Sequence, residues 1–123
     1  MHTGDNRYDY SNPDRLVRIL NEYPDLTVIG AHFGGWSVWD EAVEKLSEYP
    51  NFYVDTSSCF CDISIEKATE LIERYTPDRV LFGTDYPMWS QADDLAVFFE
   101  MGLTEAENRL ILSENAKRVF SIR

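Results

Sequence analysis

A short apolar run that leads to a carboxylate constrains this chain most. Residues 80–82 (Val-Leu-Phe) are continuously apolar, as in a strand that is covered on both faces. Gly83 and Pro87 end the run, because proline cannot donate to a strand ladder and both residues favour turns. The pattern predicts a strand of a parallel sheet with Asp85 beyond its carboxyl end, where α/β proteins hold ligands. In isolation, an aspartate in such a turn is more often a turn or cap residue.

Composition limits the class of protein. The 123 residues are 44% hydrophobic and 14% aromatic, which favours one packed domain over disorder. Eleven basic and 22 acidic side chains give a net charge of −11, so nucleic acid and anionic membranes are excluded as partners. No apolar run approaches the roughly 20 residues that span a bilayer. The first residues do not resemble a signal peptide, and we expect a cytoplasmic location.

The chain has two cysteines, Cys59 and Cys61, which are separated by one residue. This spacing matches neither a zinc knuckle nor a redox pair with two intervening residues. We expect two reduced thiols. An accessory metal or redox role is the alternative.

Strand and helix patterns alternate along the chain. Apolar runs at residues 26–30, 52–54 and 80–82 predict strands. Apolar residues at helical spacing predict helices over 13–23, 37–49, 65–75 and 91–101, and two shorter helices that end near residues 112 and 120. In the helix over 91–101, we expect Leu95, Phe98 and Phe99 to face the core. This alternation predicts a parallel sheet with right-handed crossovers, formed by one unit over residues 1–123.

Polar residues follow the strand patterns at four places: His2, His32, Asp55 and Asp85. In a closed parallel barrel the strand ends meet at one mouth, so two imidazoles and a carboxylate can reach a common metal ion or substrate. Each histidine alone has an alternative as a hydrogen-bonded loop residue. Both histidines of the chain fall where strands should end, and this coincidence favours a shared site.

Four motifs, taken in order, resemble one known family. They are His-Thr-Gly-Asp at 2–5, Val-Ile-Gly-Ala-His-Phe-Gly-Gly at 28–35, Asn-Phe-Tyr-Val-Asp-Thr-Ser at 51–57 and Val-Leu-Phe-Gly-Thr-Asp-Tyr-Pro at 80–87. The sequence Glu-Asn-Ala-Lys-Arg-Val-Phe at 114–120 closes the pattern. Together they resemble the C-terminal half of the amidohydrolase-related metal-dependent hydrolases, whose relatives include decarboxylases and lactone hydrolases. The resemblance implies an α/β fold, the C-terminal half of a (β/α)8 TIM barrel with strands 5 to 8 and their helices.

The resemblance also implies roles for single residues. His2 matches a metal-binding histidine, and Asp85 an acidic residue that binds metal, assists proton transfer, or does both. His32 matches a histidine that is a metal ligand in some members and an acid/base group in others. The implied cofactor is a divalent metal ion, zinc first and manganese second. For Asp55 we expect a structural role.

Two tryptophans, Trp36 and Trp89, are expected to wall a small-molecule substrate at the same mouth, with ordinary packing as the alternative. The resemblance implies metal-dependent hydrolysis of a small cyclic or amide- or ester-like substrate in the intact form. A metal-dependent decarboxylase of an aromatic or unsaturated carboxylic acid is the alternative within the enzymes. The alternative that is not an enzyme is an inactive fragment or an interaction half-domain.

The sequence departs from the family pattern in one respect. Family members begin with a strand that carries His-x-His, and nothing in these residues supplies it. We therefore expect a half barrel, and whether the chain alone is an enzyme stays open. Its interior is expected to consist of Val28, Phe52, Val54 and Leu81, which four strands cannot enclose. The expected partner is a second copy of the chain or a complementary half barrel.

Overall fold

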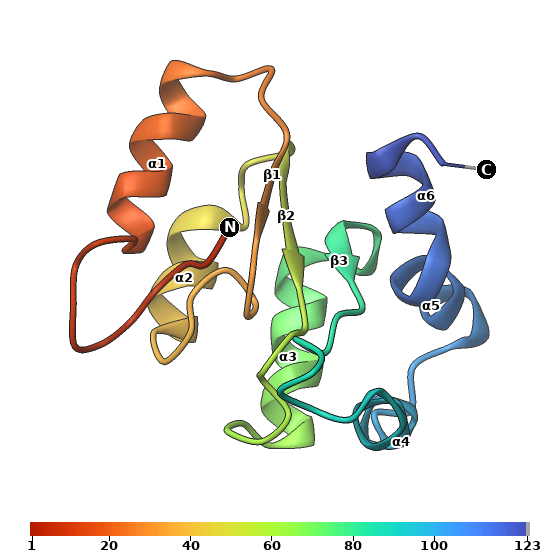
Figure 1. Cartoon of the computed structure of the whole chain (residues 1–123). Coiled ribbons are helices and arrows are strands. Elements are labelled where there is room, and N and C mark those ends of the chain that lie inside the picture. Colours follow the sequence, from red (N-terminus) through yellow and green to blue (C-terminus); the bar gives the residue numbers. More distant parts are fainter. Residues whose placement is uncertain (123) are drawn as a thin grey trace.

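Three short parallel strands form the centre of the fold. The structure is a computed structural model, and it describes residues 1–122. The strands β1 (Val28–Gly30), β2 (Phe52–Asp55) and β3 (Val80–Leu81) lie in that order in one sheet. Val28 pairs with Phe52, and Val54 pairs with Val80 (Figure 1). The predicted α/β fold, with parallel strands that alternate with helices, is confirmed.

The first residues of the chain run beside β1. The Met1 amino group donates to the Ile29 carbonyl oxygen at 2.7 Å, and the Ala31 amide donates to the Met1 carbonyl oxygen at 2.9 Å. Bonds to the residues on either side of one partner are typical of a parallel pair. The Thr3 hydroxyl donates to the Ala31 carbonyl oxygen at 2.9 Å. These bonds fix the backbone that carries His2.

Side-chain caps set the starts of four helices, one of which is α5 (Glu105–Arg109), where Thr104 and Glu107 form a capping box. Asn12 accepts from the Arg15 amide at the start of α1 (Pro13–Glu22). Ser64 and Ser90 cap α3 (Ile65–Tyr75) and α4 (Gln91–Glu100) in the same way. The helix α2 (Trp39–Leu46) is shorter than predicted, and no side chain caps it. Ser37 has a φ of 62°, which is outside the right-handed helical region, so the helix cannot start there.

The helices α2 and α3 cover one face of the sheet. The side chains of Phe52 and Val54 are fully buried, and the Phe52 ring lies 6.2 Å from the Tyr75 ring of α3. Tyr53 points to the other face, because side chains alternate along a strand, and its ring lies 6.0 Å from the Arg118 guanidinium. The expected interior is therefore wrong for three of its four residues. Phe52, Val54 and Val28, which pairs with Phe52, face the helices, whereas Leu81 lies on the opposite face.

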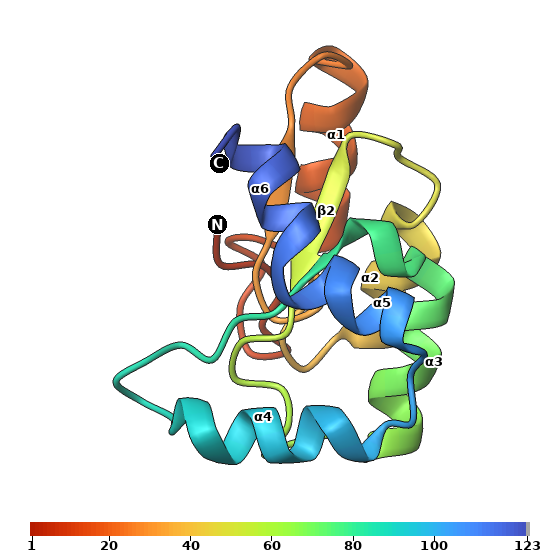
Figure 2. The same cartoon turned by 90° about the vertical axis from the view of Figure 1, so that its right-hand side faces the viewer.

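The C-terminal segment covers the edge at β3. It consists of α5 (Glu105–Arg109), the π-helix η2 (Leu110–Glu114) and α6 (Asn115–Phe120) (Figure 2). The turn η1 (Pro77–Arg79) precedes β3. The Phe82 amide donates to the Ile111 carbonyl oxygen at 2.9 Å, so Phe82 leaves the ladder and β3 is shorter than predicted. Asn115 is buried and donates to the carbonyl oxygens of Pro77 at 2.8 Å and Val80 at 2.7 Å.

One expected core residue of α4 is wrong. Phe98 is buried, but the adjacent Phe99 is 57% exposed. Neighbouring residues of a helix point about 100° apart, so a narrow apolar stripe cannot include both. No helix within residues 1–122 is long and apolar enough to cross a membrane.

Candidate functional site

An open cavity of about 280 Å³ lies where the strands end. All five predicted site residues line it, which are His2, His32, Trp36, Asp85 and Trp89. Five further residues complete the lining: Asp5, Arg7, Ser58, Asp62 and Met88. The carboxyl ends of parallel strands thus bring distant parts of the chain to one cavity, as in barrel enzymes.

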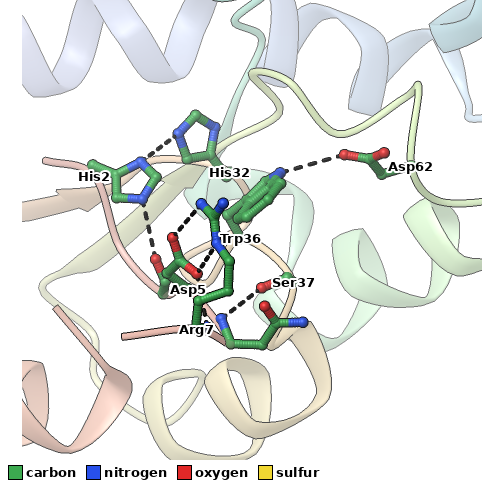
Figure 3. Close-up of polar contacts among 9 residues, drawn as sticks. His2, Asp5, Arg7, His32, Trp36, Ser37 and Asp62 are labelled. Carbon is green, nitrogen blue, oxygen red and sulfur yellow. Dashed lines mark hydrogen bonds and ion pairs between the residues drawn. The ribbon is translucent and has the colours of Figure 1, made fainter. Parts of the chain in front are cut away.

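The two histidines are in direct contact. His32 Nε2 lies 3.0 Å from His2 Nδ1, and the rings meet edge to face with centroids 4.9 Å apart (Figure 3). His32 Nδ1 lies 2.7 Å from the Ser57 carbonyl oxygen, and His2 Nε2 lies 3.1 Å from the Gly4 carbonyl oxygen. A carbonyl oxygen at each end therefore brackets the pair.

This arrangement limits where the ring protons lie. Carbonyl oxygens only accept, so His32 Nδ1 carries a proton and His32 Nε2 accepts from His2 Nδ1 when His32 is neutral. The contact between His2 Nε2 and Gly4 is a hydrogen bond only when that nitrogen is also protonated. Three bonds need three ring protons, whereas two neutral imidazoles carry two. When both rings are neutral, at most two of the three contacts are therefore hydrogen bonds.

Two side chains hold the backbone of His32. Asp55 Oδ1 accepts from the His32 amide at 3.2 Å and from the Ser57 amide at 3.0 Å. The Trp39 indole nitrogen donates to the His32 carbonyl oxygen at 3.1 Å. The contacts agree with the structural role that we expected for Asp55, which positions the loop that carries His32.

Three residues that line the cavity have an unusual backbone. His32, Ser58 and Asp85 have φ values of 60°, 53° and 60°. A side chain in this region costs roughly 1–3 kcal/mol, and such residues concentrate at functional sites. Each of the three lies just beyond a strand, so the sharp turn there aims the side chain into the cavity.

Asp85 is exposed and is part of a short hydrogen-bond chain. The Ser58 hydroxyl donates to Asp85 Oδ2 at 2.8 Å, and the Trp89 indole nitrogen donates to Ser58 Oγ at 2.9 Å. Trp89 is 36% exposed. These bonds join the loop after β2 to the loop after β3, and they fix one carboxylate oxygen of Asp85.

An arginine–aspartate pair forms the opposite rim. Arg7 Nε and Nη2 donate to the two oxygens of Asp5 at 3.0 Å and 2.9 Å. These bonds to Arg7 lower the pKa of Asp5 to about 2. The Arg7 guanidinium lies 5.7 Å from the Trp36 ring centroid, and the Trp36 indole nitrogen donates to Asp62 at 3.3 Å. We did not predict Asp5, Arg7 or Asp62, because a polar loop gives no periodic signal.

The residues described do not by themselves form a metal site. Imidazole and carboxylate ligands suit zinc and manganese chemically. His2, His32 and Asp85 share the cavity, but no group of three His, Cys, Asp or Glu side chains in residues 1–122 is arranged to hold an ion. Metal binding by these three residues stays a prediction.

The cysteines lie in the loop between β2 and α3 and form no disulfide. Cys59 is buried, and burial raises the pKa of its thiol well above the ordinary value. Cys61 is exposed, and its pKa is also raised, by desolvation and by Asp62. Thiols with raised pKa values are poor nucleophiles and metal ligands at neutral pH.

Comparison with known proteins places the chain in a family. The family model described as Amidohydrolase matches residues 1–122. The chain belongs to the amidohydrolase family. A curated relative, the gamma-resorcylate decarboxylase of Polaromonas sp. strain JS666, is 27% identical over 124 residues. That match covers 85% of this chain and 37% of the relative, so the chain spans little more than a third of the relative's length.

Solved structures of barrel proteins share the fold of this amidohydrolase chain. An uncharacterized TIM-barrel protein from Bordetella bronchiseptica matches with a TM-score of 0.84 and 28% identity, over 98% of this chain and 44% of that one. A dihydroxybenzoic acid decarboxylase from Polaromonas sp. JS666 matches with a TM-score of 0.69 and 24% identity, over 89% and 38%. The predicted part of a TIM barrel is thereby confirmed.

Metals are bound in some of these related structures. The Polaromonas decarboxylase contains manganese and the inhibitor 2-nitroresorcinol. An amidohydrolase from Burkholderia multivorans contains zinc, with a TM-score of 0.71 and 14% identity over 90% of this chain and 49% of that one. Both metals of our prediction therefore occur among proteins of this fold.

Proposed function

We propose that the cavity is the acid–base part of an active site that decarboxylates a small aromatic carboxylic acid. The observation that carries the proposal is the direct His2–His32 hydrogen bond in a cavity walled by Trp36 and Trp89. A proton source beside flat aromatic side chains suits protonation of a ring carbon. The decarboxylase among the curated relatives supports this choice of reaction over hydrolysis.

The reaction requires one proton. The bond between the ring carbon and the carboxylate breaks, its electron pair stays on the ring carbon, and carbon dioxide leaves. The histidine pair then donates a proton to that carbon, so that the carboxylate plus one proton becomes the arene and carbon dioxide. The ring nitrogens that contact each other let His2 replace the proton that His32 gives up.

The proposal for the whole protein includes a divalent ion, zinc or manganese. His2 and Asp85 are the side chains of this chain that would contribute to holding it, with His32 as a further ligand or as the acid. When bound, the ion would supply a positive charge that polarises oxygens of the substrate. Residues 1–122 contain no assembled group of three ligands, so we expect negligible turnover from the 123-residue chain alone.

Hydrolysis of a small cyclic or amide- or ester-like substrate is the second candidate. The observation that favours it is the exposed carboxylate of Asp85, which is fixed by Ser58 and can take a proton from a water molecule. Hydrolysis would add water across a C–N or C–O bond, giving an acid and an amine or alcohol, and would leave every carbon–carbon bond of the substrate intact. Carbon dioxide release therefore separates the two candidates.

The test joins this chain to the part of the Polaromonas decarboxylase that precedes the matching segment. The chimera receives manganese and 2,6-dihydroxybenzoate labelled with ¹³C in the carboxyl group, and labelled carbon dioxide is followed by NMR. We expect release that falls about a hundredfold or more in His32→Gln and Asp85→Asn. Asp25→Asn, an exposed aspartate outside the cavity, is the matched control. Lactone hydrolysis without carbon dioxide favours the second candidate, and a folded chimera with neither activity rejects both.

A further inference from the structure

We propose that Arg7 is the anion-recognition residue of this cavity, and that its guanidinium receives a second carboxylate of the substrate, away from the group that reacts. The inference extends the proposed function, because it assigns the substrate class as aromatic dicarboxylates. Neither the sequence motifs nor the matches to known proteins point to Arg7. The case for it rests on position, on unused hydrogen-bond donors and on the charges around it.

The position of Arg7 is fixed by its neighbours. Its guanidinium carbon lies 5.7 Å from the Trp36 ring centroid and 5.6 Å from the Tyr8 ring centroid. Figure 3 shows the guanidinium beside the Trp36 ring and directed toward the two histidines. Aromatic rings on a guanidinium limit its motion, so little conformational entropy remains to be lost on binding.

One edge of the Arg7 guanidinium is hydrogen-bonded to Asp5, and its outer edge has free N–H donors among residues 1–122. Nε and Nη2 each donate one bond to Asp5, at 3.0 Å and 2.9 Å. Nη1 has no hydrogen-bond partner among residues 1–122 (Figure 3). A guanidinium has five N–H groups, and its outer edge, with Nη1 and the second N–H of Nη2, matches the two oxygens of a carboxylate.

Exposure and charge favour this orientation. The Arg7 side chain is 65% exposed, whereas the Asp5 side chain is 16% exposed. The Asp5 carboxylate therefore binds the guanidinium on the side that faces away from solvent. Among the described residues that line the cavity, Arg7 is the single lysine or arginine, whereas Asp5, Asp62 and Asp85 are acidic. Asp5 is already paired with Arg7, so a bound anion is repelled by Asp62 and Asp85 and finds its N–H donors at the free edge of the Arg7 guanidinium. The side of the cavity that carries Asp62 and Asp85 is then available for a neutral or metal-bound part of the substrate.

The test measures binding to the 123-residue chain, without metal and without turnover. Isophthalate, a planar dicarboxylate, and isophthalamide, its neutral analogue, are titrated while tryptophan fluorescence is followed at constant ionic strength. We expect Arg7→Gln to weaken isophthalate binding about ten- to a hundredfold and to leave isophthalamide binding unchanged. Arg74→Gln is the matched control, because Arg74 is also an exposed, ion-paired arginine, on α3 and outside the cavity.

A further variant keeps the test decisive. Arg7→Lys retains the charge but not the two-pronged edge, so we expect intermediate affinity, and it replaces Arg7→Gln if that variant does not fold. Equal binding of isophthalate by wild type and the Arg7 variants would overturn the proposal, as would no saturable binding by the folded wild-type chain. These outcomes do not depend on the reaction. A chimera that releases no carbon dioxide rejects the proposed reaction and leaves the Arg7 result untouched.

Discussion

Removal of the buried Asn115 amide should destabilise the fold near β3. Its nitrogen donates to the carbonyl oxygens of Pro77 at 2.8 Å and Val80 at 2.7 Å, and the side chain is fully buried. Asn115→Ala removes both bonds, leaves the carbonyl oxygens without that donor, and also removes the bond that Arg118 Nη2 donates to Asn115 Oδ1 at 3.1 Å. At about 1–2 kcal/mol for each of the two bonds to carbonyl oxygens, the loss is about 2–4 kcal/mol. That is a large part of the roughly 5–15 kcal/mol by which a domain is stable.

Urea unfolding followed by tryptophan fluorescence measures this loss. Asn21→Ala is the matched control, because Asn21 is an exposed asparagine that accepts one bond from the Tyr49 hydroxyl. We expect the control to change the free energy of unfolding by less than about 0.5 kcal/mol. A loss below about 1 kcal/mol for Asn115→Ala would show that Asn115 does not hold β3 in place.

Three further predictions concern reactivity, metal binding and association. Iodoacetamide should modify Cys61 and spare the buried Cys59 in the folded chain. The rate of modification should rise with pH, because the raised pKa keeps the Cys61 thiol protonated near neutrality. Mass spectrometry that shows two labels on the folded chain would contradict this prediction. Calorimetry should find weak zinc or manganese binding, and tight binding that is unchanged in His32→Ala and Asp85→Ala would remove the site assignment. A sheet of three strands cannot close into a barrel, so we expect the chain to self-associate, and a folded monomer at micromolar concentration in the ultracentrifuge would refute it.

Local signals in the sequence predict much of the fold. The helix α3 has the predicted bounds, because Ser64 caps its start and Pro77 follows its end. The end of β3 depends instead on a long-range bond from Phe82 to Ile111, which no local pattern contains. The start of α2 is wrong in the prediction because Ser37 adopts a backbone conformation that apolar spacing does not reveal.

The faces of the strands show another limit. Alternation along β2 separates Phe52 and Val54 from Tyr53, and this follows from the sequence. The sequence does not tell which of the two faces packs against the helices, because both faces of a parallel strand can carry apolar residues. The Phe52 contact with Tyr75 decides it.

The residues of the candidate site also fall into two groups, those that the sequence predicts and those that it does not. His2, His32 and Asp85 were predictable, because residues at the ends of parallel strands converge on one cavity. Arg7 and Ser58 were not. They lie in loops, and their roles depend on contacts with Trp36 and Asp85, which are distant in the sequence.

The most direct test of the site is the state of its two histidine rings. The chain contains two histidines, so a sample with ¹⁵N-labelled histidine gives two ring systems in a long-range ¹⁵N–¹H spectrum. We predict that His32 is protonated at Nδ1, and that the nitrogens of both rings shift together when 2,6-dihydroxybenzoate is added. A His32 ring without a proton on Nδ1, or two rings that do not respond to the ligand, would contradict the assignment of this cavity as the acid–base site.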